Sequence, residues 1–194
     1  MIQTSLGSIG IGTSEELVVV DIETTGIPVS SFIVEIGICK LNFKNGNVTK
    51  LFDKTIKEKG ISPKVSREWI FSHSDLKYDD VDKSKDIDDY RNEIQKIFDQ
   101  YFVTAFNKSF DFSFLRNRKF MIYKESYCPM VLLTPIMKLP SSYGSYKFPK
   151  VEEAWRYLFP SIDYIEKHRA YDDACHEAQI IYELIKKGWF RIKF

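Results

Sequence analysis

Two carboxylates stand side by side after a β-branched stretch near the start of the chain. Asp21 and Glu23 follow Leu17–Val20 and precede a Thr-Thr-Gly break. Side chains alternate along a strand, so both acids should share one face while Ile22 enters the opposite layer. Neighbouring acids repel each other unless a cation lies between them, and such hard oxygen ligands suit Mg²⁺ or Mn²⁺ better than zinc. Taken alone, the pair is more typical of a solvent-facing strand end.

Further candidates lie in the second half of the chain. Asp111 follows an apolar stretch, Phe102–Phe106, at the head of a predicted helix, where capping is the default interpretation of a carboxylate. Asp173 lies one turn before Glu177, next to the apolar stripe of the last predicted helix, and His168 precedes that helix on a loop. A neutral imidazole can accept a proton from water near neutral pH. A histidine close to these acids therefore fits general base catalysis with metal ions.

The elements that must position these residues follow from local patterns. An Asn-Gly turn joins the second and third predicted strands, and Glu35 in the second strand is interpreted as a paired or solvated strand carboxylate. The predicted strands are 17–26, 32–42, 47–57 and 102–106. The predicted helices are 86–101, a helix led by 107–109, 151–159 and 171–187, with a short strand or helix at 128–139 and an irregular segment at 58–85. This order predicts an α/β domain whose mixed sheet has its first three strands antiparallel and is flanked by helices.

The composition predicts one ordinary globular domain. The chain has 194 residues and 44% hydrophobic content, which fits a single domain over residues 15–194 behind a flexible leader over residues 1–14. The leader lacks the basic start and apolar core of a secretory signal, and no apolar run is long enough for a membrane span. Three scattered cysteines predict free thiols in a reducing, cytoplasmic location. A net charge of +1 does not by itself indicate a nucleic-acid-binding protein. An enzyme whose metal ions neutralise the phosphate, however, needs no basic surface.

Three short stretches that carry these candidate residues follow one another along the chain: Asp21–Gly26 (DIETTG), Phe106–Asp111 (FNKSFD) and His168–Asp173 (HRAYDD). Together they resemble the three exonuclease motifs of the DEDDh (DnaQ-like) 3′–5′ exonucleases, which have a ribonuclease H-like fold. The resemblance runs from about Leu17 to Lys187, which is nearly the whole chain. Each motif is moderately specific by itself, whereas the ordered triplet at this spacing is highly specific.

The resemblance implies a site and a reaction. The implied metal ligands are Asp21, Glu23, Asp111 and Asp173, and the implied general base is His168. The interval between histidine and acid in the third motif selects Asp173 over Asp172, which is interpreted as a helix-start carboxylate on the solvent side. Two divalent ions, Mg²⁺ or Mn²⁺, would then support hydrolysis of phosphodiester bonds from the 3′ end of single-stranded DNA or RNA, with release of nucleoside 5′-monophosphates.

The resemblance also implies where the substrate lies. Thr24, Thr25 and Ile27 would line the 3′-terminal nucleotide, Thr24 through its backbone and Ile27 against the base. Asn107 would neighbour the scissile phosphate or its sugar, and Phe110 is a candidate for stacking on a base. The other aromatic candidates, each more typical of core or loop packing, are Trp69, Phe114, Tyr143 and Tyr146.

The chain differs from the family pattern at two places, and the sequence leaves several alternative functions open. Many relatives have a histidine where this chain has Phe106 and an Asp-Thr pair where it has Cys128-Pro129, so the subfamily is undetermined. An inactive exonuclease-like module that binds nucleic acid should have lost one of the five key residues, and all five are present. A glycoside hydrolase and a ribonuclease H-like endonuclease are the remaining enzyme classes. The sequence leaves open DNA or RNA as substrate, a free-standing enzyme or a proofreading subunit on a DNA polymerase, and a monomer or a homodimer.

Overall fold

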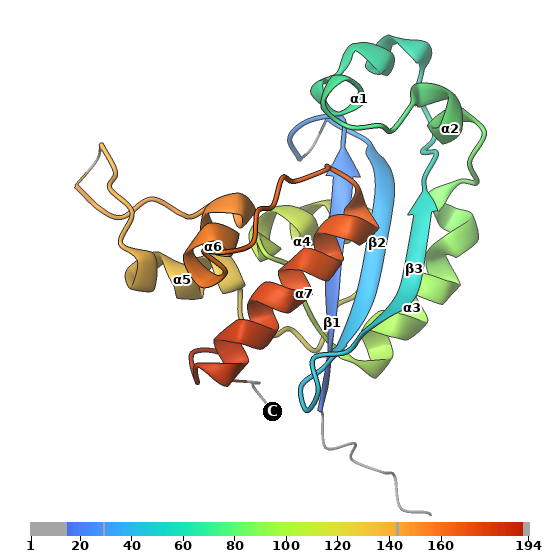
Figure 1. Cartoon of the computed structure of the whole chain (residues 1–194). Coiled ribbons are helices and arrows are strands. Elements are labelled where there is room, and N and C mark those ends of the chain that lie inside the picture. Colours follow the sequence, from blue (N-terminus) through green and yellow to red (C-terminus); the bar gives the residue numbers. More distant parts are fainter. Residues whose placement is uncertain (1–14, 29, 143, 192–194) are drawn as a thin grey trace, which may run out of the picture.

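A four-stranded mixed sheet forms the centre of the computed structural model, which describes residues 15–28, 30–142 and 144–191 (Figure 1). The predicted leader over residues 1–14 lies outside the described residues. The strands are β1 (Glu16–Thr24), β2 (Ile33–Asn42), β3 (Val48–Thr55) and β4 (Phe102–Thr104), in the spatial order β3-β2-β1-β4. β1 and β3 both run antiparallel to β2, and β4 runs parallel to β1. The predicted α/β class and the antiparallel first three strands are therefore confirmed.

The helices surround this sheet and refine the sequence-based boundaries. They are the 3₁₀ turns η1 (Pro63–Arg67) and η2 (Ile87–Tyr90), and the α-helices α1 (Trp69–His73), α2 (Tyr78–Asp82), α3 (Arg91–Gln100), α4 (Lys108–Asn117), α5 (Pro129–Met137), α6 (Val151–Leu158) and α7 (Ala170–Lys186). The segment predicted to be irregular thus contains the 3₁₀ turn η1 and the two short α-helices α1 and α2, and the ambiguous segment at 128–139 is helical. β1 ends at Thr24 rather than Gly26, and the backbone N–H of the next residue, Thr25, donates to the carbonyl of Phe32.

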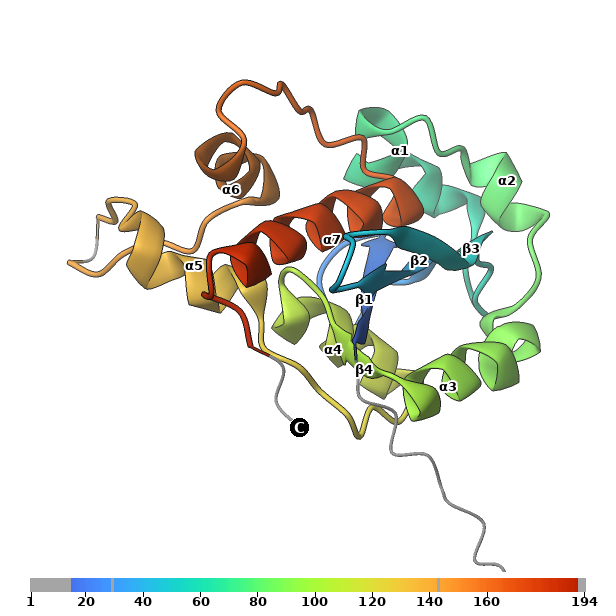
Figure 2. The ribbon, with the colours of Figure 1, turned by 60° about the horizontal axis from the view of Figure 1, so that its bottom comes forward.

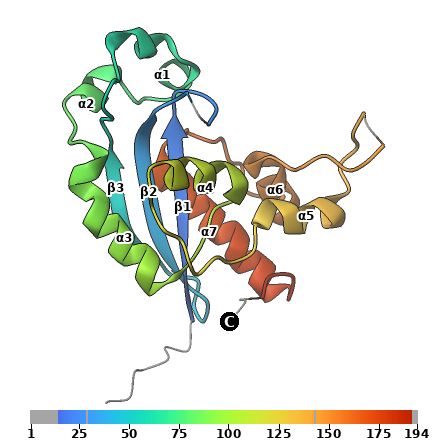
Figure 3. The same ribbon diagram turned by 180° about the vertical axis from the view of Figure 1, so that it is seen from behind.

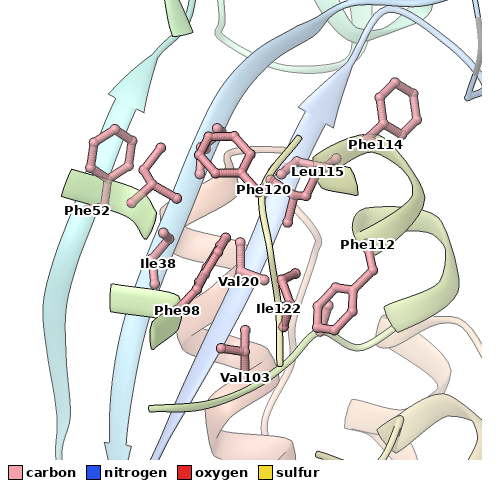
Figure 4. Close-up of a cluster of buried hydrophobic side chains, with 14 of the residues drawn as sticks. Val20, Ile38, Phe52, Phe98, Val103, Phe112, Phe114, Leu115, Phe120 and Ile122 are labelled. Carbon is pink, nitrogen blue, oxygen red and sulfur yellow. The ribbon is translucent and has the colours of Figure 1, made fainter. Parts of the chain in front are cut away.

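The two faces of β1 pack against different helices. Val18, Val20 and Ile22 belong to an apolar cluster formed with side chains of α3 and α4. Figure 4 shows aromatic rings of this cluster around Val20. Leu17 and Val19 belong to a second cluster built with α5, α6 and α7. Figure 1 shows α7 crossing one face of the sheet, and Figure 3 shows α3 and α4 on the other. Burying apolar side chains on both faces fixes which way the alternating residues of β1 point.

The start of α7 lies directly against β2, and a single glycine permits this approach. A Cβ atom on Gly37 would lie 2.2 Å from the carbonyl carbon of Ala170, far inside van der Waals contact. We therefore expect Gly37→Ala to lower the free energy of unfolding by about 3 kcal/mol, because backbone rather than a flexible side chain must move. Urea denaturation followed by circular dichroism measures this loss.

The matched control is Thr49→Ala on the exposed part of β3, which should change the free energy of unfolding by less than about 0.5 kcal/mol. A Gly37→Ala protein as stable as this control would contradict the close contact between α7 and β2.

Two further findings concern the whole described chain. Across the described ranges, no helix combines the length and the apolar character that crossing a membrane requires. Cys39, Cys128 and Cys175 are all free thiols, as the sequence predicted.

Candidate active site

β1 presents its two acids to the face that α7 covers. Asp21 lies opposite Gly37 of β2, and Glu23 lies opposite Glu35. Ile22, between the two acids, is 4% exposed and belongs to the opposite core. The predicted alternation is therefore confirmed. Asp21 and Glu23 are half-buried, because α7 packs on that face of the strand.

α4 brings the third acid to the same place. Asp111 lies one turn into α4 and is only 4% exposed, whereas the residue at the N-cap is Asn107. Burial raises the pKa of Asp111 to about 7, although the backbone amides of Asp111 and Ile22 partly oppose this shift. Default capping is thus the wrong interpretation of Asp111. Its carboxyl group lies close enough to Asp21 to raise the pKa of that group as well.

Asp173 is fixed within the first turn of α7. It is 1% exposed; its Oδ1 accepts a hydrogen bond from the Tyr164 hydroxyl at 2.8 Å, and its Oδ2 accepts one from the backbone N–H of Arg169 at 2.9 Å. These two bonds hold the carboxylate in one orientation.

The loop before α7 is anchored to the sheet by an ion pair between the half-buried Arg169 and the buried Glu35. The Arg169 guanidinium donates to Glu35 at 2.7 Å and to Asp75 at 2.6 Å, and the amide of Ala170 also donates to Glu35, at 2.9 Å. Glu35 is 1% exposed, so it is the paired strand carboxylate that the sequence favoured. This anchor fixes the backbone immediately after His168.

His168 lies beside two of the acids. Single ligand atoms of Glu23, His168 and Asp173 lie within 4.8 Å of one another. The backbone of His168 has φ +53°, an uncommon conformation for a non-glycine residue, and its Nδ1 lies 3.9 Å from Oε1 of Glu166. Burial lowers the pKa of His168, which favours the neutral imidazole at physiological pH.

The electrostatics of the acids favour a bound cation. Burial raises the pKa of Asp21 most, followed by the charges of Glu177, Asp111, Glu23 and Asp173. Burial and then the Asp173 charge raise the pKa of Glu23 to about 9. Within the described residues, the charged groups that most influence both acids are carboxylates. A cluster of hard oxygen donors with uncompensated negative charge fits divalent cations such as Mg²⁺ or Mn²⁺.

Two further acids belong to this cluster, and motif reasoning assigned neither of them a role. Glu177 is 3% exposed, accepts a hydrogen bond from the backbone N–H of Phe106 at 3.1 Å, and is the charge with the largest effect on Asp21. Burial and the Asp173 charge raise the pKa of Glu166 to about 7. The helical period could have found Glu177, because it lies one turn after Asp173 on the same buried face of α7.

The predicted substrate residues at the end of β1 and in the loop after it differ in exposure and in hydrogen bonding. The Thr24 hydroxyl donates to the carbonyl of Gly26 at 2.7 Å. Thr25 is 8% exposed, and its hydroxyl accepts a hydrogen bond from the backbone N–H of Phe32 at 3.0 Å, so this side chain closes the loop. Ile27, four residues after Glu23, is 73% exposed, so its large apolar side chain is open to solvent.

The remaining residues predicted to contact the substrate include exposed, half-buried and buried side chains. Asn107 is exposed at the start of α4, and Phe110 is half-buried with its ring 5.1 Å from that of Phe114. Phe114 is fully buried and is a core residue, whereas Trp69 and Tyr146 are exposed. The remaining aromatic candidate, Tyr143, lies outside the described residues.

Most of the chain matches a known protein family. The family model for RNase T, described as an exonuclease, matches residues 18–181. The chain belongs to this exonuclease family. The resemblance to the DEDDh, DnaQ-like enzymes is therefore confirmed, and with it the ribonuclease H-like fold. A comparison of the sequence with curated proteins found no match.

Solved structures support the fold of this exonuclease. A full-length 3′-exonuclease superposes with a TM-score of 0.68 at 15% identity, over 92% of this chain and 63% of that one. The nuclease domain of 3′hExo, a DEDDh family member bound to rAMP, gives a TM-score of 0.67 at 15% identity, over 94% and 98%. Exonuclease I of E. coli, in complex with an oligonucleotide, gives 0.62 at 12% identity, over 89% and 41%. The chain thus spans less than two thirds of the first and third of these proteins.

The crowded acids of this exonuclease predict an unusual pH dependence. The pKa values of Glu23, at about 9, and of Asp111 and Glu166, at about 7, lie above those of the unfolded chain. The folded state therefore holds protons that the unfolded state releases, and stability falls as pH rises through this range. In EDTA we expect the free energy of unfolding to be at least about 2 kcal/mol higher at pH 5.5 than at pH 8.5.

Thermal unfolding at both pH values, with EDTA or with millimolar Mn²⁺, tests this expectation. Mn²⁺ should stabilise the protein more at pH 8.5, because ionised carboxylates are the ligands and protons compete for them. A metal-free protein that becomes more stable as pH rises, or that does not respond to Mn²⁺, would contradict it.

Proposed function

We propose that this exonuclease depends on divalent metal ions and removes nucleoside 5′-monophosphates stepwise from the 3′ end of single-stranded DNA or RNA. The observation that carries the proposal is the convergence of Glu23, His168 and Asp173, whose ligand atoms lie within 4.8 Å of one another although they come from β1 and from the start of α7. Asp21 and Asp111 complete an acidic cluster at the same place.

The acids would hold two metal ions. Asp21, Glu23, Asp111 and Asp173 supply hard oxygen ligands whose mutual repulsion a divalent cation would relieve. When bound, such ions polarise the phosphodiester and stabilise the departing oxygen. Tyr164 orients the Asp173 carboxylate through the hydroxyl hydrogen bond at Oδ1. The buried Glu177 would support the site by accepting a hydrogen bond from the backbone N–H of Phe106, the first residue of the motif that carries Asp111.

His168 would act as the general base. Its neutral imidazole can accept a proton from the attacking water at a ring nitrogen, and burial in this site favours the neutral form. The Arg169–Glu35 ion pair fixes the residue that follows His168, and the imidazole lies close to Glu23 and Asp173.

The substrate residues would hold the last nucleotide. The open side chain of Ile27 would pack against the terminal base, the backbone of Thr24 would line the nucleotide, and Asn107 would contact its phosphate or sugar. Thr25 would contribute by closing the loop, and Phe110 by its half-buried ring at the head of α4. One structural neighbour recognises the 3′ end of a histone mRNA stem-loop and another was solved with an oligonucleotide, so both RNA and DNA are kept as substrates.

Single-stranded oligonucleotides labelled at the 3′ or the 5′ end test the polarity directly. With Mg²⁺ or Mn²⁺, we expect labelled mononucleotide to leave 3′-labelled strands at once, while 5′-labelled strands shorten one nucleotide at a time. EDTA should stop both signals. Matched DNA and RNA strands in the same assay decide the polymer, and internal cuts or intact strands would overturn the proposal.

Binding partners are the last part of the proposal. A free-standing enzyme and a proofreading subunit docked on a DNA polymerase both need the same site. Sedimentation of the protein alone distinguishes monomer from homodimer, and addition of a polymerase catalytic subunit tests the second arrangement.

A further inference from the structure

Two of the free thiols meet between α7 and β2. Cys39 of β2 is completely buried, and Cys175 of α7 is half-buried. The Cys39 thiol donates to the backbone carbonyl of Ala174 at 3.3 Å, and the sulfur of the next residue, Cys175, also lies within hydrogen-bonding range of that thiol. We name Cys39 and Cys175 the thiol pair. The proposed mechanism uses neither residue, so the pair is a reactive group without an assigned role.

The backbones that carry the thiol pair lie very close together. Gly37, two residues before Cys39 on the same face of β2, lets α7 approach until an added Cβ atom would lie 2.2 Å from the backbone of Ala170. Cys175 follows Ala170 by little more than one helical turn. Figures 1 and 2 both show this part of α7 lying against β2. A disulfide needs Cα atoms within about 7 Å of each other, and a helix this close to a strand permits that spacing.

The two thiols differ in their access to solvent. Cys39 belongs to the apolar cluster between the sheet and α7. Cys175 lies at the edge of that interface, where its neighbours are the half-buried Tyr171 and the exposed Lys50 of β3. The Lys50 ammonium lies 4.2 Å from the centre of the Tyr171 ring, so polar groups line this edge. A small oxidant from solvent therefore meets Cys175 first, and Cys39 is placed to react with Cys175 afterwards.

We propose that Cys39 and Cys175 form a disulfide when the protein meets a hydroperoxide, and that this bond fastens α7 to the sheet. The inference goes beyond the proposed function and does not depend on it. The bond would lie close to the candidate active site, because Cys175 follows Asp173 by two residues. A cross-link between residues so far apart in the sequence would restrict the unfolded chain and thereby stabilise the fold.

The oxidation takes place in two balanced steps. First, the Cys175 sulfur attacks the terminal oxygen of the hydroperoxide, the O–O bond breaks, and the thiol proton passes to the departing oxygen, which leaves as an alcohol or as water. Cys175 is then a sulfenic acid, and the two electrons that its sulfur lost have reduced the peroxide. Second, the Cys39 sulfur attacks the Cys175 sulfur, the S–O bond breaks, and hydroxide leaves with the Cys39 proton as water.

Mass spectrometry tests whether the bond forms. Under limiting hydrogen peroxide, the protein should lose the mass of two hydrogen atoms, and a digest without reductant should contain the peptides of Cys39 and Cys175 joined together. Dithiothreitol should reverse both changes. The control is Cys128→Ser, which should behave like the parent because the Cys128 thiol donates to the carbonyl of Phe106 at 3.2 Å rather than to a thiol. A protein that only gains oxygen atoms, or a bond that includes Cys128, would overturn the proposal.

Two further variants test the order of the steps. In Cys39→Ser, Cys175 should accumulate as a sulfenic acid that dimedone labels, whereas in Cys175→Ser the buried Cys39 should remain a thiol. Labelling of Cys39, or a Cys175 that stays unlabelled, would overturn this order. Serine can keep the hydrogen bond to the carbonyl of Ala174, so we expect Cys39→Ser to fold. If circular dichroism shows that a variant is unfolded, the joined peptides of the parent decide whether the proposal holds.

Urea denaturation tests whether the bond fastens α7. The oxidised parent and the oxidised Cys128→Ser control should both unfold at a higher urea midpoint than their reduced forms. Cys39→Ser and Cys175→Ser should show no such shift after the same treatment. An oxidised parent that contains the bond but unfolds at the same or a lower urea concentration would overturn the stabilising role of the thiol pair.

Discussion

Replacing Asp21 by asparagine is expected to abolish the hydrolysis of phosphodiester bonds. Asp21 lies at the centre of the cluster, where the charges of four other carboxylates act on it. Asparagine keeps the shape of the side chain but removes the charge that would attract a divalent ion. We expect the rate of mononucleotide release to fall at least about 10³-fold, which corresponds to roughly 4 kcal/mol of lost transition-state stabilisation.

A second measurement separates this loss from unfolding. Because the substitution removes one charge from a crowded buried cluster, the metal-free variant should unfold at a higher temperature than the parent in EDTA at pH 8. Asp80→Asn, which changes an exposed aspartate on α2, is the matched control and should retain full activity. An Asp21→Asn protein with a tenth or more of the parent rate would contradict the assignment of Asp21 as a metal ligand.

Replacing His168 by alanine is expected to lower the rate about 10²- to 10⁴-fold, the range typical for loss of a general base. The affinity for Mn²⁺, measured by calorimetry, should remain within about threefold of the parent, because a general base does not bind the metal ion. The proximity of His168 to Glu23 and Asp173 makes this measurement decisive. A large loss of Mn²⁺ affinity would show that His168 is a ligand.

The pH profile assigns the role to one histidine. The rate of the parent enzyme at saturating Mn²⁺ should fall as pH drops below the ordinary range for imidazole, since burial lowers the pKa of His168 and protonation removes the base. The chain has three histidines. His176→Gln should keep this acidic limb although it disturbs packing against Tyr164, whereas His168→Ala should remove the contribution of imidazole.

The sequence predicted the architecture because its apolar patterns are strong and local. The β-branched run before Asp21 and the Asn-Gly turn predicted the first three strands, and the alternation along β1 predicted which face Asp21 and Glu23 share. The three motifs predicted the family in order, although Asp111 alone favoured helix capping. The helix dipole alone favours a capping role for Asp111, whereas its place in the second motif indicates a metal ligand.

The parts that could not be predicted depend on packing between distant segments. The helical period places Glu177 on the same face of α7 as Asp173, but its hydrogen bond to the backbone N–H of Phe106, 71 residues earlier in the chain, is visible only in the structure. The irregular segment after β3 gave no sign that Trp69 would reach His168, because the two are brought together by the anchor between Asp75 and Arg169. Contacts of this kind have no periodic signature in a single sequence.

α7 has a consequence for how this protein is made. It covers one face of β1 and β2 nearly alone, it carries Asp173, and every other described strand and helix precedes it in the chain. During synthesis, the apolar face formed by Leu17, Val19 and Leu41 therefore stays uncovered until this helix has left the ribosome. The site is completed by the same late docking event, since its acids come from residues far apart in sequence. A nascent chain that lacks α7 therefore also lacks Asp173, and its uncovered apolar face needs protection from aggregation.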